Sequence, residues 1–129
     1  MLKFKKYAVF FIIGGLGYAI IELLWRGRTH WSMMLAGGIC FILFSVIAEK
    51  LRGQRLLYKA ILCALAVTAV EFIFGIVFNI ILRMQVWDYS GVPFNFLGQI
   101  CLLYTVIWGI LGLVFVPLAD FLNKKMQKI

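Results

Sequence analysis

The sequence has little charge, little proline and few residues of the kinds that bind metals. Charged residues make up 14% of its 129 residues and only five are acidic, whereas a soluble domain has about 25% charged residues. Two prolines, and no stretch rich in proline or serine, give no sign of a linker, so we expect a single domain over residues 1–129. One histidine, and three cysteines without a CxxC pair, exclude the usual zinc and haem motifs, so we expect no metal site and no cofactor.

Long apolar stretches dominate the sequence instead. Four of them, residues 7–25, 31–48, 56–82 and 94–122, are long enough to cross a hydrocarbon core of about 30 Å, which takes about 20 helical residues. The first stretch is longer than a signal-peptide core, and we interpret it as a retained helix. The sequence therefore predicts an all-α, polytopic membrane protein with four transmembrane helices.

The basic residues are distributed unevenly between the two sides that alternating helices would create. Three, Arg26, Arg28 and Arg83, fall on one side. The other ten are Lys3, Lys5, Lys6, Lys50, Arg52, Arg55, Lys59, Lys124, Lys125 and Lys128. Short cytoplasmic loops carry the excess of lysine and arginine, so we expect both termini in the cytoplasm. The net charge of +8 then lies beside the membrane, where it attracts anionic lipids, and we expect no nucleic-acid partner.

A faint internal repeat accompanies this pattern. Residues 36–40 (AGGIC) resemble residues 97–101 (LGQIC), and Glu22 and Glu71 each follow an apolar run. Two helices per unit would make the repeats parallel, related by an axis along the membrane normal. The sequence thus suggests two parallel two-helix repeats.

Two carboxylates fall inside predicted helices. Glu22, Arg26 and His30 are four residues apart and share one helix face. Glu71 lies about 16 Å below the outer end of its helix, and Asn79 follows it on the same stripe. Ionisable groups in a membrane are costly and usually functional, although Glu22 could merely pair with Arg26, and Glu71 could merely hold neighbouring helices.

The remaining polar residues of the membrane region also fall in its outer half, whereas the inner halves of the helices are almost purely apolar. We expect Asn95 and Gln99 to lie one turn apart on the fourth helix, and Trp25, Trp31 and Trp87 to mark the outer interface, where tryptophan is enriched. These positions predict a polar vestibule with Glu71 at its floor. Its expected members are Glu22, Arg26, Arg28, His30, Glu71, Asn79, Arg83, Trp87, Asp88, Asn95 and Gln99.

Three segments resemble a known family. They are residues 21–32 (IELLWRGRTHWS), 86–90 (VWDYS) and 93–101 (PFNFLGQIC). Together they are similar to a bacterial family of small membrane proteins labelled ABC-transporter permeases (type IV, CmpB-like), and the likeness covers nearly the whole chain. The resemblance implies a multi-pass protein of the inner membrane with a role in transport. The chain contains no P-loop, so the resemblance does not imply ATP hydrolysis by these residues.

We therefore expect a small transporter or permease that binds a polar or charged solute in the vestibule. The outer arginines would attract an anionic group, and Glu71 or Glu22 a cation or a coupled proton. Four helices enclose little volume, which favours a homodimer or a larger membrane complex. Two alternatives stay open: an enzyme at the outer leaflet that uses Glu22, His30, Glu71 and Asp88 as acids and bases, although no GxSxG motif is present, and a structural or regulatory subunit.

The topology can be tested by labelling single cysteines in intact cells. In a background without the native cysteines, Ser90→Cys should react with a membrane-impermeant maleimide, because the loop around residue 90 is expected outside. Lys128→Cys should react only after the cells are opened. Labelling of Lys128→Cys from outside would contradict the predicted orientation.

Overall fold

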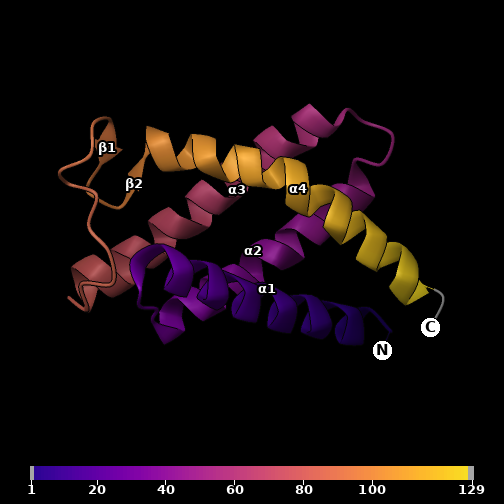
Figure 1. Ribbon diagram of the computed structural model, residues 1–129, viewed down its shortest axis with the longest axis horizontal. Coiled ribbons are helices and arrows are strands. Elements are labelled where there is room, and N and C mark those ends of the chain that lie inside the picture. The colour runs from indigo at the N-terminus through magenta and orange to yellow at the C-terminus, as the bar shows by residue number, and fades with distance from the viewer. Residues whose placement is uncertain (1, 128–129) are drawn as a thin grey trace.

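The structure is a bundle of four long helices with one elaborate loop. The computed structural model describes residues 2–127, with the side chains of residues 4–126, so Lys128 lies outside it. Its elements are α1 (Leu2–Arg26), α2 (Trp31–Lys50), α3 (Leu56–Phe74) with its π-helical continuation η1 (Gly75–Ile81), the strands β1 (Asn95–Phe96) and β2 (Ile100–Cys101), and α4 (Leu102–Gln127) (Figure 1). The two strands form an antiparallel pair.

Four helices are long and apolar enough to span a membrane, as the sequence predicts, and the protein is a multi-pass membrane protein. Both ends of the described chain lie at one end of the bundle, together with the loop between α2 and α3 (Figure 1). We call this the terminal end. The opposite end, here the loop end, carries the short connection from α1 to α2 and the long loop 82–101. Which end faces the cytoplasm stays a prediction.

Glycine contacts hold α1 tightly against α2. A Cβ at Gly14 would lie 2.5 Å from the Cβ of Phe41, and one at Gly37 would lie 2.5 Å from the Cβ of Tyr18. A Cβ at Gly15 would lie 2.9 Å from the carbonyl oxygen of Met34. In lipid, where helices gain little from the hydrophobic effect, such close backbone approach is a main source of association.

A second seam of small residues joins α3 to α4. Ala60 lies against Gly112 and Ala64 against Gly109, where an added Cβ would meet them at 3.3 Å and 3.6 Å. One turn further, the hydroxyl groups of Thr68 and Thr105 are 2.8 Å apart and hydrogen-bonded. The seam includes the Ala60, Ala64 and Thr68 positions that recur every four residues in the sequence. The two seams divide the bundle into an α1–α2 pair and an α3–α4 pair.

The fourth helix begins later than predicted. Residues 94–101 are not helical, because they form β1, a turn and β2 before α4 starts at Leu102. Phe94, Leu97 and Gly98 have φ between 55° and 72°, which is incompatible with a right-handed helix. The expectation that Asn95 and Gln99 lie one turn apart on a helix is therefore wrong. At the other end of this stretch, Pro117 lies inside α4, which continues to Gln127.

The terminal half of the bundle is less apolar than predicted. Ser45 of α2 and Asn123 of α4 are fully buried, and the Ser45 hydroxyl donates to Asn123 Oδ1 over 2.9 Å. Lys6 and Glu49 form an ion pair that ties α1 to α2 near this end. These polar groups contact each other inside the protein, as buried polar groups must in a membrane.

The two segments that suggested an internal repeat differ in backbone structure. Residues 36–40 lie in the middle of α2, whereas residues 97–101 form a turn and β2. The short identities between these two segments therefore accompany different structures.

The α1–α2 contact gives a matched pair of variants. Gly14→Ala should lower the melting temperature in detergent by several degrees, because its Cβ has no room and overpacking costs about 1–3 kcal/mol. Gly17→Ala is the control on the same helix, because an added Cβ there meets no atom within 4 Å. Equal melting temperatures for the two variants would contradict the close contact.

Candidate functional site

The loop between η1 and α4 folds back onto the bundle and is held there by Asn79. The Asn79 side-chain oxygen accepts hydrogen bonds from the backbone N–H groups of Val86 (2.7 Å) and Trp87 (3.4 Å). Its amide nitrogen donates to Gln99 Oε1 over 2.8 Å. One side chain therefore joins the exit from the third helix to both halves of the loop.

Gln99 occupies the space that Gly75 leaves empty. A Cβ at Gly75 would lie 2.8 Å from the Cβ of Gln99, so the π-helical segment η1 begins where this side chain packs. The Gln99 side-chain amide donates to the carbonyl oxygen of Leu97, and the backbone carbonyl oxygen of Gln99 accepts from Trp87 Nε1 over 2.9 Å. Because Gln99 and Trp87 are both about 6% exposed, these bonds are shielded from competing water.

Glu71 interacts with the same loop and not with an arginine. Its Oε2 accepts a hydrogen bond from the Tyr89 hydroxyl over 2.9 Å, and Tyr89 stacks on Tyr104 of α4 with ring centroids 4.9 Å apart. Burial and the nearby Glu71 carboxylate raise the pKa of Tyr89, so this hydroxyl stays a donor. Within the described side chains Glu71 forms no ion pair, so neither Arg26 nor Arg83, the basic residues of the outer half that would be the natural partners of this carboxylate, compensates its charge.

The predicted contact between Glu22 and Arg26 is confirmed. Arg26 Nη1 lies 3.4 Å from Glu22 Oε2, and its Nη2 donates to the carbonyl oxygen of Val86 over 2.7 Å. Arg26 thus clamps the start of the long loop to α1. The side chain of Glu22 is only 5% exposed, and its other oxygen, Oε1, is buried without a hydrogen-bond partner among the described residues.

A cavity of about 500 Å³ opens beside this clamp, between α1, the long loop and α4. We call it the loop-end cavity. Its charged lining residues are Glu22, Arg26, Arg28 and Asp88, and aromatic rings form much of the remaining wall. The aromatic residues are Tyr18, Trp25, Trp87, Tyr89, Tyr104 and Trp108. The backbone N–H of Ser90 donates to Asp88 Oδ1 and lowers the pKa of that exposed carboxyl, which keeps it charged.

The predicted site residues separate into two groups in the structure. Four line the loop-end cavity together with Trp87, whereas Asn79, Gln99 and Glu71 hold the loop behind it. Glu71 is not at the floor of the cavity, because Tyr89 is the residue of that pair that lines it. Asn95 is exposed and bonds only to backbone groups of its own loop, and Arg83 is exposed and outside the cavity wall.

His30 has a structural contact. Its Nδ1 accepts from the backbone N–H of Ser32 (3.2 Å), lies 2.7 Å from the Ser32 hydroxyl, and caps the start of α2. The Ser32 side chain is fully buried, whereas His30 is half-buried, and the contact between them forms the N-terminal cap of α2. A side chamber of about 130 Å³ separates His30 from the loop and shares Glu22, Arg26 and Arg28 with the larger cavity. No group of histidine, cysteine or acidic residues in the described part of the chain could hold a metal ion.

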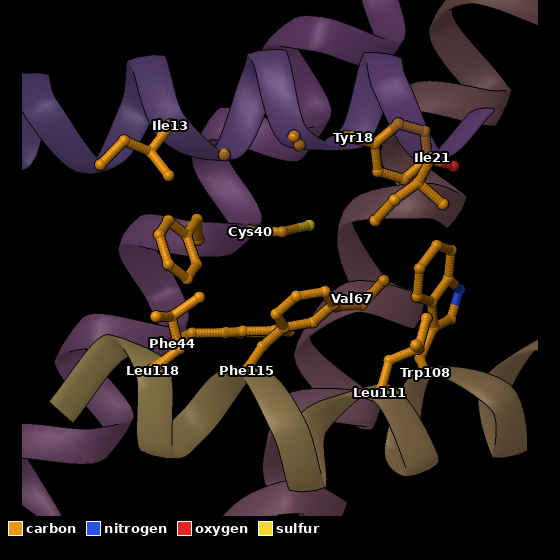
Figure 2. A pocket seen from close by; sticks show the side chains of 14 residues that line it. Ile13, Tyr18, Ile21, Cys40, Phe44, Val67, Trp108, Leu111, Phe115 and Leu118 are labelled. Carbon is orange, nitrogen blue, oxygen red and sulfur yellow. The ribbon is translucent and has the colours of Figure 1, made fainter. Parts of the chain in front are cut away.

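A second, apolar space continues from the loop-end cavity toward the terminal end. It has a volume of about 190 Å³ and lies between α1 and α4, with Cys40 and Phe44 of α2 and Val67 of α3 behind it (Figure 2). We call it the lateral groove. Tyr18, Ile21, Trp108 and Leu111 line both spaces, so the two are neighbours along the same α1–α4 gap.

Sequence reasoning missed the aromatic residues of α4. Tyr104 and Trp108 are one helical turn apart and face the cavity, but inside an apolar stretch they are indistinguishable from lipid-facing aromatics. The spacing of Tyr18, Glu22 and Arg26 by four residues could have identified Tyr18. Trp25 and Trp31 are mostly exposed, as expected at an interface, whereas Trp87 is buried.

Comparison with known proteins gives one match. Residues 8–129 match the model of a protein family described as "Putative ABC-transporter type IV". No curated protein and no solved structure matches the chain.

The role of Asn79 in holding the loop can be tested directly. Asn79→Ala should leave the N–H groups of Val86 and Trp87 without their acceptor, which costs about 1–3 kcal/mol for buried groups. Hydrogen exchange over residues 82–101 should therefore become faster. Gln54→Ala, an exposed position at the terminal end, is the control. Unchanged exchange in Asn79→Ala would refute this role.

Proposed function

We infer that this chain, which belongs to the family described as "Putative ABC-transporter type IV", is a small membrane permease whose loop-end cavity binds a polar or charged group of its solute. The residues proposed to contact that group are Glu22, Arg26, Arg28 and Asp88. The remaining predicted residues, among them Glu71, Asn79, Trp87 and Gln99, are proposed to position the loop that closes one side of the cavity.

The buried carboxylate of Glu22 is the observation that carries this proposal. Its Oε1 lies without a partner beside a cavity, and an unsatisfied charged acceptor in a membrane protein is costly. Arg26 satisfies only the other oxygen. A donor group on a bound solute would supply the missing hydrogen bond. This bond would offset the cost of burying the Glu22 oxygen.

The size and lining of the cavity fit a small molecule. Its volume of about 500 Å³ lies in the range of ligand pockets, about 300–1,000 Å³. Aromatic walls surround a few charged groups, which is the usual composition of such pockets. Arg28, which makes no ion pair among the described side chains, is free to attract an anionic group.

The proposed orientation follows from the basic residues. Ten of thirteen lie at the terminal end by sequence position, so we propose that this end is cytoplasmic and that the cavity opens toward the outside. We also propose that the permease works as a homodimer or within a larger membrane complex, because transport in an ABC system requires an ATPase that these residues do not contain.

Ligand-dependent melting tests the proposal. The purified protein should be heated with amino acids, small organic cations, inorganic phosphate and phosphoethanolamine. At least one compound should raise the melting temperature of the wild type, because binding at 100 times Kd stabilises by about 2.7 kcal/mol. Arg28→Gln should abolish the shift, and Arg52→Gln, exposed at the terminal end, should retain it.

A shift that persists in both Arg28→Gln and Glu22→Gln would place binding outside the cavity. No shift with any compound would leave the loop-end cavity without a soluble ligand and would contradict the proposal in this form.

A further inference from the structure

We propose that the solute is a phospholipid with a zwitterionic, primary-amine headgroup, which enters sideways through the lateral groove. The headgroup occupies the loop-end cavity and the first part of one acyl chain lies in the groove, while the rest of that chain and the second chain remain in the bilayer. This inference rests on the proposed function, because it names the class of solute for the same cavity.

The lateral groove exists because the close helix packing occurs within the α1–α2 pair and within the α3–α4 pair, and not between α1 and α4. Gly14 and Gly37 bring α1 onto α2, and the Ala60–Gly112 contact brings α4 onto α3. Between α1 and α4 the groove-lining positions on α1 include Gly17, where an added Cβ would meet no atom within 4 Å. Gly17 therefore leaves a space in the apolar groove that none of the described side chains fills.

The shape of the groove suits an acyl chain. Between Ile21 and Ile13, the α1 residues at the two ends of the groove, the helix rises about 12 Å, close to half of a hydrocarbon core of about 30 Å. The wall is apolar, with Ile13, Phe115 and Leu118 among its members. Apolar cavities of about 150 Å³ are known to bind small apolar molecules, and this groove holds about 190 Å³. A partner helix is about 10–12 Å across and is too wide to enter it.

The formal charges of the side chains that line the loop-end cavity sum to zero. Glu22 and Asp88 contribute two negative charges, and Arg26 and Arg28 two positive charges. Arg26 is already occupied by Glu22 and Val86. The groups left for a ligand are therefore the Arg28 guanidinium, which suits a phosphate, and the Glu22 Oε1 with the Asp88 carboxylate, which suit a cation.

The unpartnered oxygen of Glu22 distinguishes between zwitterionic headgroups by the hydrogen-bond donors that they carry. It needs a hydrogen-bond donor, because it is buried and has none. A primary ammonium donates three hydrogen bonds, whereas a quaternary ammonium donates none. The cavity therefore favours a phosphoethanolamine head over a phosphocholine head, and over an anionic head that would leave the Asp88 carboxylate without a cationic partner among the described side chains.

Photo-crosslinking in vesicles tests the inference. The protein should be reconstituted into phosphatidylcholine vesicles that contain a little phosphatidylethanolamine with a diazirine in its acyl chain. Adducts should concentrate on peptides that contain groove residues such as Trp108 and Phe115. Excess unlabelled phosphatidylethanolamine should reduce them at least fivefold, and excess phosphatidylglycerol should have little effect.

Two variants fill the groove from the same wall. Gly17→Leu and Ile13→Trp should each reduce the groove adducts at least fivefold. Ala69→Leu, a similar enlargement at an exposed position on α3, should leave them unchanged. Asp88→Asn should reduce the preference for phosphatidylethanolamine over phosphatidylglycerol, because it removes a partner of the ammonium, whereas the phosphate proposed to contact Arg28 is present in both lipids.

The outcomes separate this inference from the proposed function. Adducts spread evenly over all lipid-facing helices, and insensitive to both groove-filling variants, would overturn the lipid assignment. If a soluble compound nevertheless shifted the melting temperature of Gly17→Leu and wild type equally, the permease proposal would stand with a solute that has no acyl chain.

Discussion

The hydrogen bond between Asn79 and Gln99 supports the whole loop end of this protein. It joins the last turn of the third transmembrane segment to the residues that lead into α4, over 2.8 Å. The Asn79 side chain also accepts from the backbone N–H groups of Val86 and Trp87, and the backbone carbonyl oxygen of Gln99 accepts from the Trp87 indole. Irregular backbone near a membrane is stable only where its polar groups are satisfied within the protein. This bond therefore helps to hold the wall that Trp87 and Tyr89 form beside the cavity, together with the hydrogen bonds from Arg26 to Val86 and from Tyr89 to Glu71.

The separation of the bundle into two helix pairs creates the space that the loop covers. Small residues draw α1 to α2 and α3 to α4 so closely that larger side chains cannot enter either seam. Close packing in lipid is favourable only where backbones can meet, and α1 and α4 offer each other aromatic and branched side chains instead. The gap between them is therefore charged and aromatic at the loop end and apolar toward the middle. This gradient matches the bilayer itself, which is polar at the interface and apolar inside.

Much of the architecture could be predicted from the sequence. The four apolar stretches correspond to the four long helices, because each stretch must bury its backbone polar groups in helical hydrogen bonds. The Glu22–Arg26 contact follows from a spacing of four residues within one helix. The start of α4 could not be predicted in this way. Residues 94–101 read as part of an apolar stretch, and left-handed conformations at Phe94 and Leu97 are not encoded by glycine.

The sequence alone determined that this is a four-helix membrane protein with its polar intramembrane groups mostly in one half, because hydropathy and local spacing act within single segments. The tertiary structure decided what those groups do. Glu71 and Glu22 look alike in the sequence, and each has one buried oxygen without a partner among the described residues, yet Glu71 accepts a hydrogen bond from Tyr89 of the long loop, whereas Glu22 pairs with Arg26 and lines the cavity. The difference arises from contacts between residues far apart in the chain, such as Asn79 with Gln99 and Arg26 with Val86. No local pattern encodes such pairings, because they depend on how the loop and the two helix pairs meet in space.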